Sequence, residues 1–75
     1  MKERIYRVEF ITKKHGCRHW AIDIEADTRK EAMETAKAMW RRDIMLHIFR
    51  IYRMTAIELG NGEEPEYSFF KRIER

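Results

Sequence analysis

The sequence predicts an α+β domain in the order strand–strand–helix–strand–strand, with one helix packed on one face of a four-stranded antiparallel sheet. Three observations support this fold class. Two segments near the N-terminus alternate apolar and polar residues with a period of two, which is typical of half-buried strands. A segment with a capping signal and helical spacing of apolar residues follows them. The remainder is rich in β-branched and aromatic residues, which favour strands.

The chain has 75 residues, so we expect a single small domain over residues 1–75. A chain of this size buries only about 60–65% of the surface that it exposes when unfolded, so its core is thin. The lone cysteine excludes an internal disulfide and fits a reducing compartment. The N-terminal stretch lacks the apolar core of a signal peptide, and the apolar cluster at residues 44–59 is too polar and too short to cross a bilayer. We therefore expect a cytoplasmic protein with no membrane partner.

The two alternating segments are residues 5–12 and 18–26, and we expect them to form a hairpin. The first places Tyr6, Val8 and Phe10 on one side. The second places Trp20, Ile22, Ile24 and Ala26 on one side. Residues 13–17 between them contain one glycine and have the length of an ordinary hairpin loop.

A helix is predicted after this hairpin. Thr28 and Glu31 form a capping-box pattern, in which each side chain is able to satisfy the free backbone N–H of the other residue. The apolar residues that follow fall on one stripe at helical spacing: Ala32, Ala36, Met39 and Trp40. The two alanines would allow the helix to lie close to the sheet, whereas Met39 and Trp40 fill its far end.

The chain after this helix is ambiguous. We favour a break at residues 42–45 and a strand over residues 46–59, although a helix continuing through residues 44–54 would also form an apolar stripe. Residues 60–65 carry a turn signal, and residues 66–73 are predicted to form the last strand. A right-handed crossover through the helix would give the strand order 2-1-3-4.

The predicted sheet has more apolar side chains than one helix can cover. The third strand is apolar on both faces, whereas an antiparallel sheet with one face in water normally alternates sharply. Three explanations remain open: an interaction surface, a β-bulge that switches the facing of half a strand, or a helical segment at residues 44–54. The first explanation makes six residues interface candidates: Ile5, Ile11, Ile48, Tyr52, Met54 and Phe70.

Catalytic and metal chemistry are poorly supported. His15, Cys17 and His19 are ligand-type residues, but alternate residues of a strand stand about 6.6 Å apart, too far to meet one ion without a tight curl. A Cys17 nucleophile would need an oriented base and a pocket, for which a hairpin tip gives no sign. Asp23 and Glu25 are expected to be a solvated pair. We predict no catalytic residues, no metal and no cofactor.

The leading hypothesis is a small non-catalytic protein-interaction module, homodimeric through its sheet face or edge. The alternative is a nucleic-acid-binding protein, because aromatic and basic side chains on a sheet can stack bases and neutralise phosphates. Basic and acidic segments alternate along the chain and the net charge is only +3, so the fold decides whether a basic surface exists. The residues of this alternative are Lys13, Lys14, Arg18, Arg50, Arg53, Lys71 and Arg72.

Overall fold

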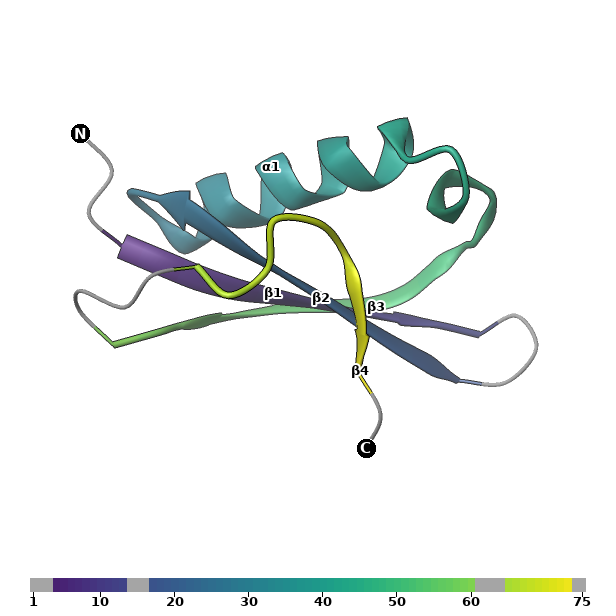
Figure 1. The fold of residues 1–75 in the computed structure, drawn as a ribbon, viewed down its shortest axis with the longest axis horizontal. Helices are drawn as coiled ribbons and strands as arrows, with labels where there is room; N and C mark the ends of the chain where they lie inside the picture. The colour runs from purple at the N-terminus through teal and green to yellow at the C-terminus, as the bar shows by residue number, and fades with distance from the viewer. Residues whose placement is uncertain (1–3, 14–16, 61–64, 74–75) are drawn as a thin grey trace.

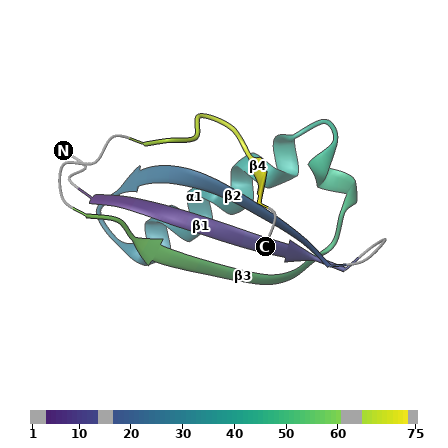
Figure 2. The same ribbon diagram turned by 60° about the horizontal axis from the view of Figure 1, so that its bottom comes forward.

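The structure is a computed structural model that describes residues 4–13, 17–60 and 65–73 (Figure 1). The chain forms β1 (Arg4–Thr12), β2 (Arg18–Ala26), α1 (Arg29–Arg42), a 3₁₀ turn η1 (Leu46–Ile48), β3 (Ile51–Glu58) and β4 (Lys71–Ile73). Within these described residues, four antiparallel strands form one sheet and α1 covers one of its faces, which confirms the predicted α+β class. The opposite face, here called the open face, comes forward in Figure 2.

The hairpin forms where the alternation predicts it. β1 and β2 pair along their whole length, with Tyr6 opposite Ile24 and Val8 opposite Ile22. Paired residues point to the same face of a sheet, so the even-numbered residues of both strands point toward α1. The apolar side chains among them form the core together with residues of α1 and η1. The predicted loop residues 14–16 lie outside the described residues.

The capping signal marks the start of α1. The hydroxyl of Thr28 accepts the backbone N–H of Glu31 at 3.1 Å. Ala32 and Ala36 are fully buried, and their small side chains allow α1 to lie close to the sheet. Trp40 is only 2% exposed and closes the core at the far end of α1. The predicted apolar stripe is therefore the face that α1 buries.

The helix ends at Arg42, within the predicted break. The carboxylate of Asp43 accepts the backbone N–H groups of Met45 and Leu46, each at 2.8 Å, which offers these groups an alternative to continued helical bonding. The chain then makes the turn η1 and enters β3 at Ile51. The predicted strand over residues 46–59 therefore starts too early, and Ile48 lies in η1. The alternative of a helix through residues 44–54 is wrong.

A β-bulge in β3 explains part of the mixed apolar pattern. Ile11 pairs with Arg53, whereas the next residue, Thr12, pairs with Ile51, so Tyr52 is an extra residue on β3. Ile51 packs against the core under α1, but Arg53 shares the open face with Ile11. The bulge that we considered as one explanation is thus present.

The strand order is 3-1-2-4, so the expected order 2-1-3-4 is wrong in the place that it gave to the last strand. The chain from β3 crosses to the other edge of the sheet, where β4 pairs with β2 (Figures 1 and 2). The aromatic ring of Phe70 lies 5.4 Å from that of Phe10 and 5.1 Å from that of Trp40. This packing anchors the chain beside β2. The predicted strand over residues 66–73 is reduced to Lys71–Ile73.

The C-terminal segment is also held by an ion pair on the open face. Arg7 donates to both carboxylate oxygens of Asp23, at 2.9 and 3.1 Å, and to Glu66 at 3.0 Å. The backbone N–H of Glu66 donates to the Asp23 carboxylate at 3.0 Å. The hydrogen bond with Asp23 raises the pKa of the Arg7 guanidinium above its ordinary value. Asp23 is therefore a buried acceptor that joins β1, β2 and the segment before β4, and not the solvated acid that we expected.

The capping bond of α1 can be tested by removing the Thr28 hydroxyl. Thr28→Ala is expected to lower the free energy of unfolding by about 1 kcal/mol, because it leaves an N-terminal backbone N–H of the helix without its acceptor. Urea denaturation followed by circular dichroism measures the change. Thr28→Ser keeps the hydroxyl and should retain most of the stability; equal losses in both variants would contradict the assignment.

The role of Asp23 can be tested in the same assay. Asp23→Ala is expected to lower the free energy of unfolding by about 2 kcal/mol, because the partly buried Arg7 and the N–H of Glu66 lose their shared acceptor. Glu25→Ala is the matched control, since Glu25 is an exposed acid on the same face of β2. The control should change stability by less than about 0.5 kcal/mol. A similar loss in both variants would contradict the role of Asp23.

Candidate functional site

The outer edge of β3 is a candidate interaction site. Among the described residues, β3 pairs only with β1, so one edge of this strand is unpaired. Leu59 donates its backbone N–H to the carbonyl of Ile5 at 2.7 Å, which fixes the direction of the neighbouring backbone groups. Because these directions alternate along a strand, Met54, Ala56 and Glu58 direct their N–H and C=O groups away from the sheet. An unpaired edge of this kind is a template for another strand.

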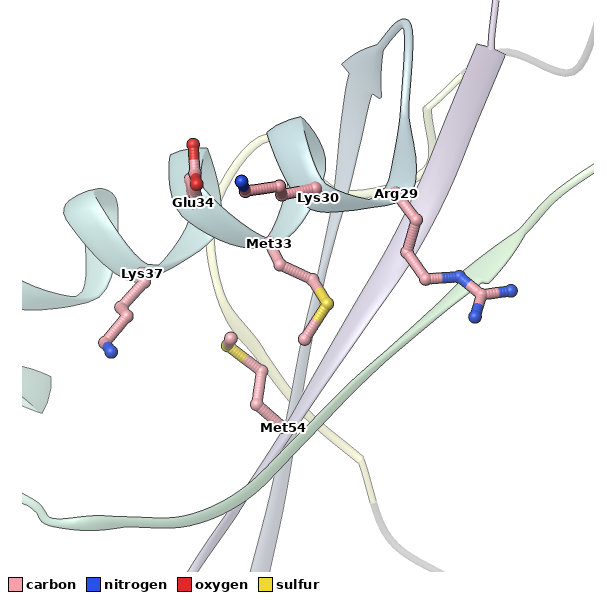
Figure 3. Close-up of a pocket in the computed structure, with 6 residues that line it drawn as sticks. All are labelled: Arg29, Lys30, Met33, Glu34, Lys37 and Met54. Carbon is pink, nitrogen blue, oxygen red and sulfur yellow. The ribbon is translucent and has the colours of Figure 1, made fainter.

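A groove lies beside this edge, between α1 and β3, and is here called the methionine groove (Figure 3). Its volume is about 480 Å³. Met33 from α1 and Met54 from β3 point toward one another in it. The residues that line it are Arg29, Lys30, Met33, Glu34, Lys37 and Met54. Three of these are cations and one is an acid, so the groove is apolar at its floor and basic at its rim.

The six interface candidates do not form one surface. Ile5 and Ile11 are half-buried residues of the open face, and Tyr52 is exposed at the bulge. Met54 and Phe70 pack against the core instead. Ile48 is exposed in η1, outside the sheet. Sequence reasoning considered a bulge but could not place it at Tyr52, where it separates the facing of residues that a regular strand would keep together. The exposed Ile57 of β3 was not among the candidates.

The fold gathers most of the basic candidates at one end of the molecule. The strand register puts Arg18 opposite Thr12, and Arg53 opposite Ile11, close to the β1–β2 loop. The C-terminal end of α1 lies at the same end (Figure 1). We call this region the basic end, defined by Lys13, Arg18, Arg41, Arg42, Arg50, Arg53 and Arg72. Lys71 contacts the ring of Tyr67 instead, and Lys14 lies outside the described residues.

Two described acids near the basic end, Asp43 and Glu9, are already engaged. Asp43 accepts two backbone N–H groups after α1. Glu9 is buried and lies 3.3 Å from a ring nitrogen of His19. Arg18 and Arg72 have no ion-pair partner among the described residues. The positive charge of this end is therefore largely uncompensated within the part of the chain that the structure describes.

A pocket of about 370 Å³ opens at the basic end, on the side of the sheet that carries α1. We call it the aromatic pocket. Its lining residues are Arg18, Trp20, Asp43, Met45, Leu46, Phe49, Phe70 and Arg72. The indole N–H of Trp20 is buried and finds no hydrogen-bond partner in the described residues, a condition that costs about 1–3 kcal/mol. The pocket thus combines aromatic residues with two guanidinium groups that have no ion-pair partner in the described part of the chain.

A second, smaller hollow of about 290 Å³ lies beside residues 50–52. It is lined by Lys13, Arg50, Ile51 and Tyr52. The ammonium group of Lys13 lies 4.2 Å from the centre of the Tyr52 ring, within the range of a cation–π interaction. The structure therefore places the exposed ring of Tyr52 beside the cation of Lys13, a contact between residues far apart in the sequence.

In the described residues, no group of three or more His, Cys, Asp or Glu side chains is placed to hold a metal ion. Cys17 is exposed, and His19 is engaged with Glu9. His15 lies outside the described residues. None of the described helices is both long enough and apolar enough to span a membrane.

Comparison with known proteins gives no relative: no family model, no curated protein and no solved structure matches the chain.

Proposed function

We propose that the protein is an interaction module that forms a homodimer through the outer edge of β3. The observation that carries this proposal is the unpaired edge of an eight-residue strand, with the backbone groups of Met54, Ala56 and Glu58 directed outward. Addition of a strand from a second copy would pair these groups. The edge lacks proline, and the bulge at Tyr52 interrupts only its first residues.

An antiparallel pairing centred on Ala56 fits this edge best. It places Met54 opposite the partner's Glu58, and the reciprocal pair forms on the other side of the two-fold axis. All three outward-directed residues are then paired, and the bulge stays outside the paired region. Centring on Met54 instead would oppose the extra residue Tyr52 to Ala56 of the other copy and lose the regular register.

Charge complementarity favours a second copy as the occupant of the edge. Met54 shares the methionine groove with Lys37, and residues paired across strands point to the same face. The carboxylate of the partner's Glu58 would therefore enter the groove beside Lys37. Glu58 is available for this exchange, because its ion pair with Arg4 is 3.7 Å long and both side chains are about half exposed. Such an exposed pair contributes only about 0–1 kcal/mol.

The pairing can be tested by exchanging the two charges. Glu58→Lys and Lys37→Glu are each expected to weaken the dimer about tenfold or more, because two symmetry-related attractions of up to about 1 kcal/mol become repulsions. The double variant Lys37→Glu/Glu58→Lys restores the opposite charges and should recover most of the affinity. Sedimentation equilibrium over a range of concentrations measures the dissociation constant.

Glu25→Lys is the matched control, since it makes the same charge change at an exposed position of β2 and should leave the dimer unaffected. A wild-type protein that stays monomeric at the highest soluble concentration would overturn the proposal. A dimer that the double variant fails to restore would place the interface elsewhere. Denaturation curves of each variant show whether the monomer itself remains folded.

A further inference from the structure

The strand register places two unpaired guanidinium groups on one side of the aromatic pocket. Arg18 and Trp20 are alternate residues of β2 and therefore point to the same face. Arg72 on β4 is directly opposite Trp20, so Arg18 and Arg72 are diagonal neighbours. Both line the pocket, and neither has an ion-pair partner among the described residues. Two neighbouring cations that lack an ion-pair partner among the described residues are well suited to one anionic group.

The rest of the pocket suits a flat apolar group. The rings of Trp20, Phe49 and Phe70 contribute to its lining, and Asp43, the acid that also lines it, has one carboxylate oxygen bound to two backbone N–H groups. Phe70 is held in place by its ring contacts with Trp40 and Phe10, so this wall is packed into the core. The volume of about 370 Å³ is at the small end of the range of about 300–1,000 Å³ that is usual for ligand pockets.

We infer that the aromatic pocket binds one base of a single-stranded nucleic acid while Arg18 and Arg72 bind the adjacent phosphate. An aromatic pocket stacks a base of any type, and cations beside it neutralise the backbone, which is the general design of single-strand binding. The basic end extends this surface through Arg50 and Lys13 to the exposed ring of Tyr52, which offers a second stacking position. The inference is independent of dimerisation, since none of these side chains belongs to the outward-directed part of β3.

A nucleic acid suits this surface better than an acidic protein segment. The cations at the basic end are spread around two separate aromatic sites, and a polynucleotide alternates bases and phosphates along its length. An acidic peptide would satisfy the arginines but would leave the aromatic rings without flat partners. The shared chemistry of single-stranded RNA and DNA, a base next to a phosphate, is what the pocket recognises.

The test measures binding of short fluorescein-labelled oligo(dT) and oligo(U) strands to the full chain by fluorescence anisotropy at low salt. The double variant Arg18→Gln/Arg72→Gln is expected to weaken binding about tenfold or more and to reduce the slope of log affinity against log salt by about 0.7, as expected when one phosphate is no longer neutralised. The control Arg29→Gln/Lys30→Gln removes the same charge at the methionine groove. It should leave the affinity for the oligonucleotide and the salt slope nearly unchanged. Comparison of the two oligonucleotides separates DNA from RNA as the natural ligand.

Absence of binding to both strands at low salt would overturn the inference, because phosphate contacts are strongest there. If the control double variant weakens binding as much as Arg18→Gln/Arg72→Gln does, the inference is also overturned. The affinity would then depend on the net charge of the protein and not on the residues of the aromatic pocket. Displacement of the oligonucleotide by an equal concentration of a poly-glutamate peptide would assign the surface to an acidic protein partner instead. Circular dichroism of both double variants verifies that the fold is intact.

Discussion

The packing of Phe70 against Trp40 and Phe10 is the contact on which the arrangement of the sheet depends. Trp40 at the end of α1 touches rings from β1, β2 and the segment before β4, so one side chain links the helix to the sheet and to the C-terminal segment. Once Phe70 occupies this site, β4 can pair with the edge of β2 but not with β3. The same contact thus builds one wall of the aromatic pocket and leaves the edge of β3 open.

The two candidate surfaces are separate consequences of this arrangement. The β3 edge and the methionine groove lie along one side of α1, whereas the aromatic pocket lies between η1, β2 and β4. Charge is distributed accordingly. Glu58 and Glu25 lie near the end of the sheet where β1 begins, whereas Arg18 and Arg53 lie near the end of β1. A small net charge is therefore compatible with a concentrated basic region, because the fold separates charges that alternate along the sequence.

The apolar side chains that α1 does not cover are not gathered on a single exposed face of the sheet. The bulge turns Ile51 toward the core. The C-terminal segment lies on the open face, where Glu66 forms hydrogen bonds with Arg7 and Asp23. The guanidinium of Arg7 also lies 5.1 Å from the centre of the Tyr67 ring. Three exposed apolar side chains, Ile44, Met45 and Ile48, lie in the connection between α1 and β3, where Ile44 is 88% exposed. This connection borders the aromatic pocket at Met45.

The sequence by itself determined the elements whose signals are local. Strict alternation located β1 and β2, and the Thr28 cap with its alanine stripe located α1, because a strand or helix that buries one face leaves its period in the chain. Only the tertiary structure decided three other features. These are the strand with which β4 pairs, the faces to which Ile51 and Tyr52 point, and the placement of Arg18 and Arg72 around one pocket. Each of these depends on contacts between residues far apart in the chain, such as Phe10 with Phe70 or Ile11 with Arg53, and such contacts leave no periodic pattern in the sequence.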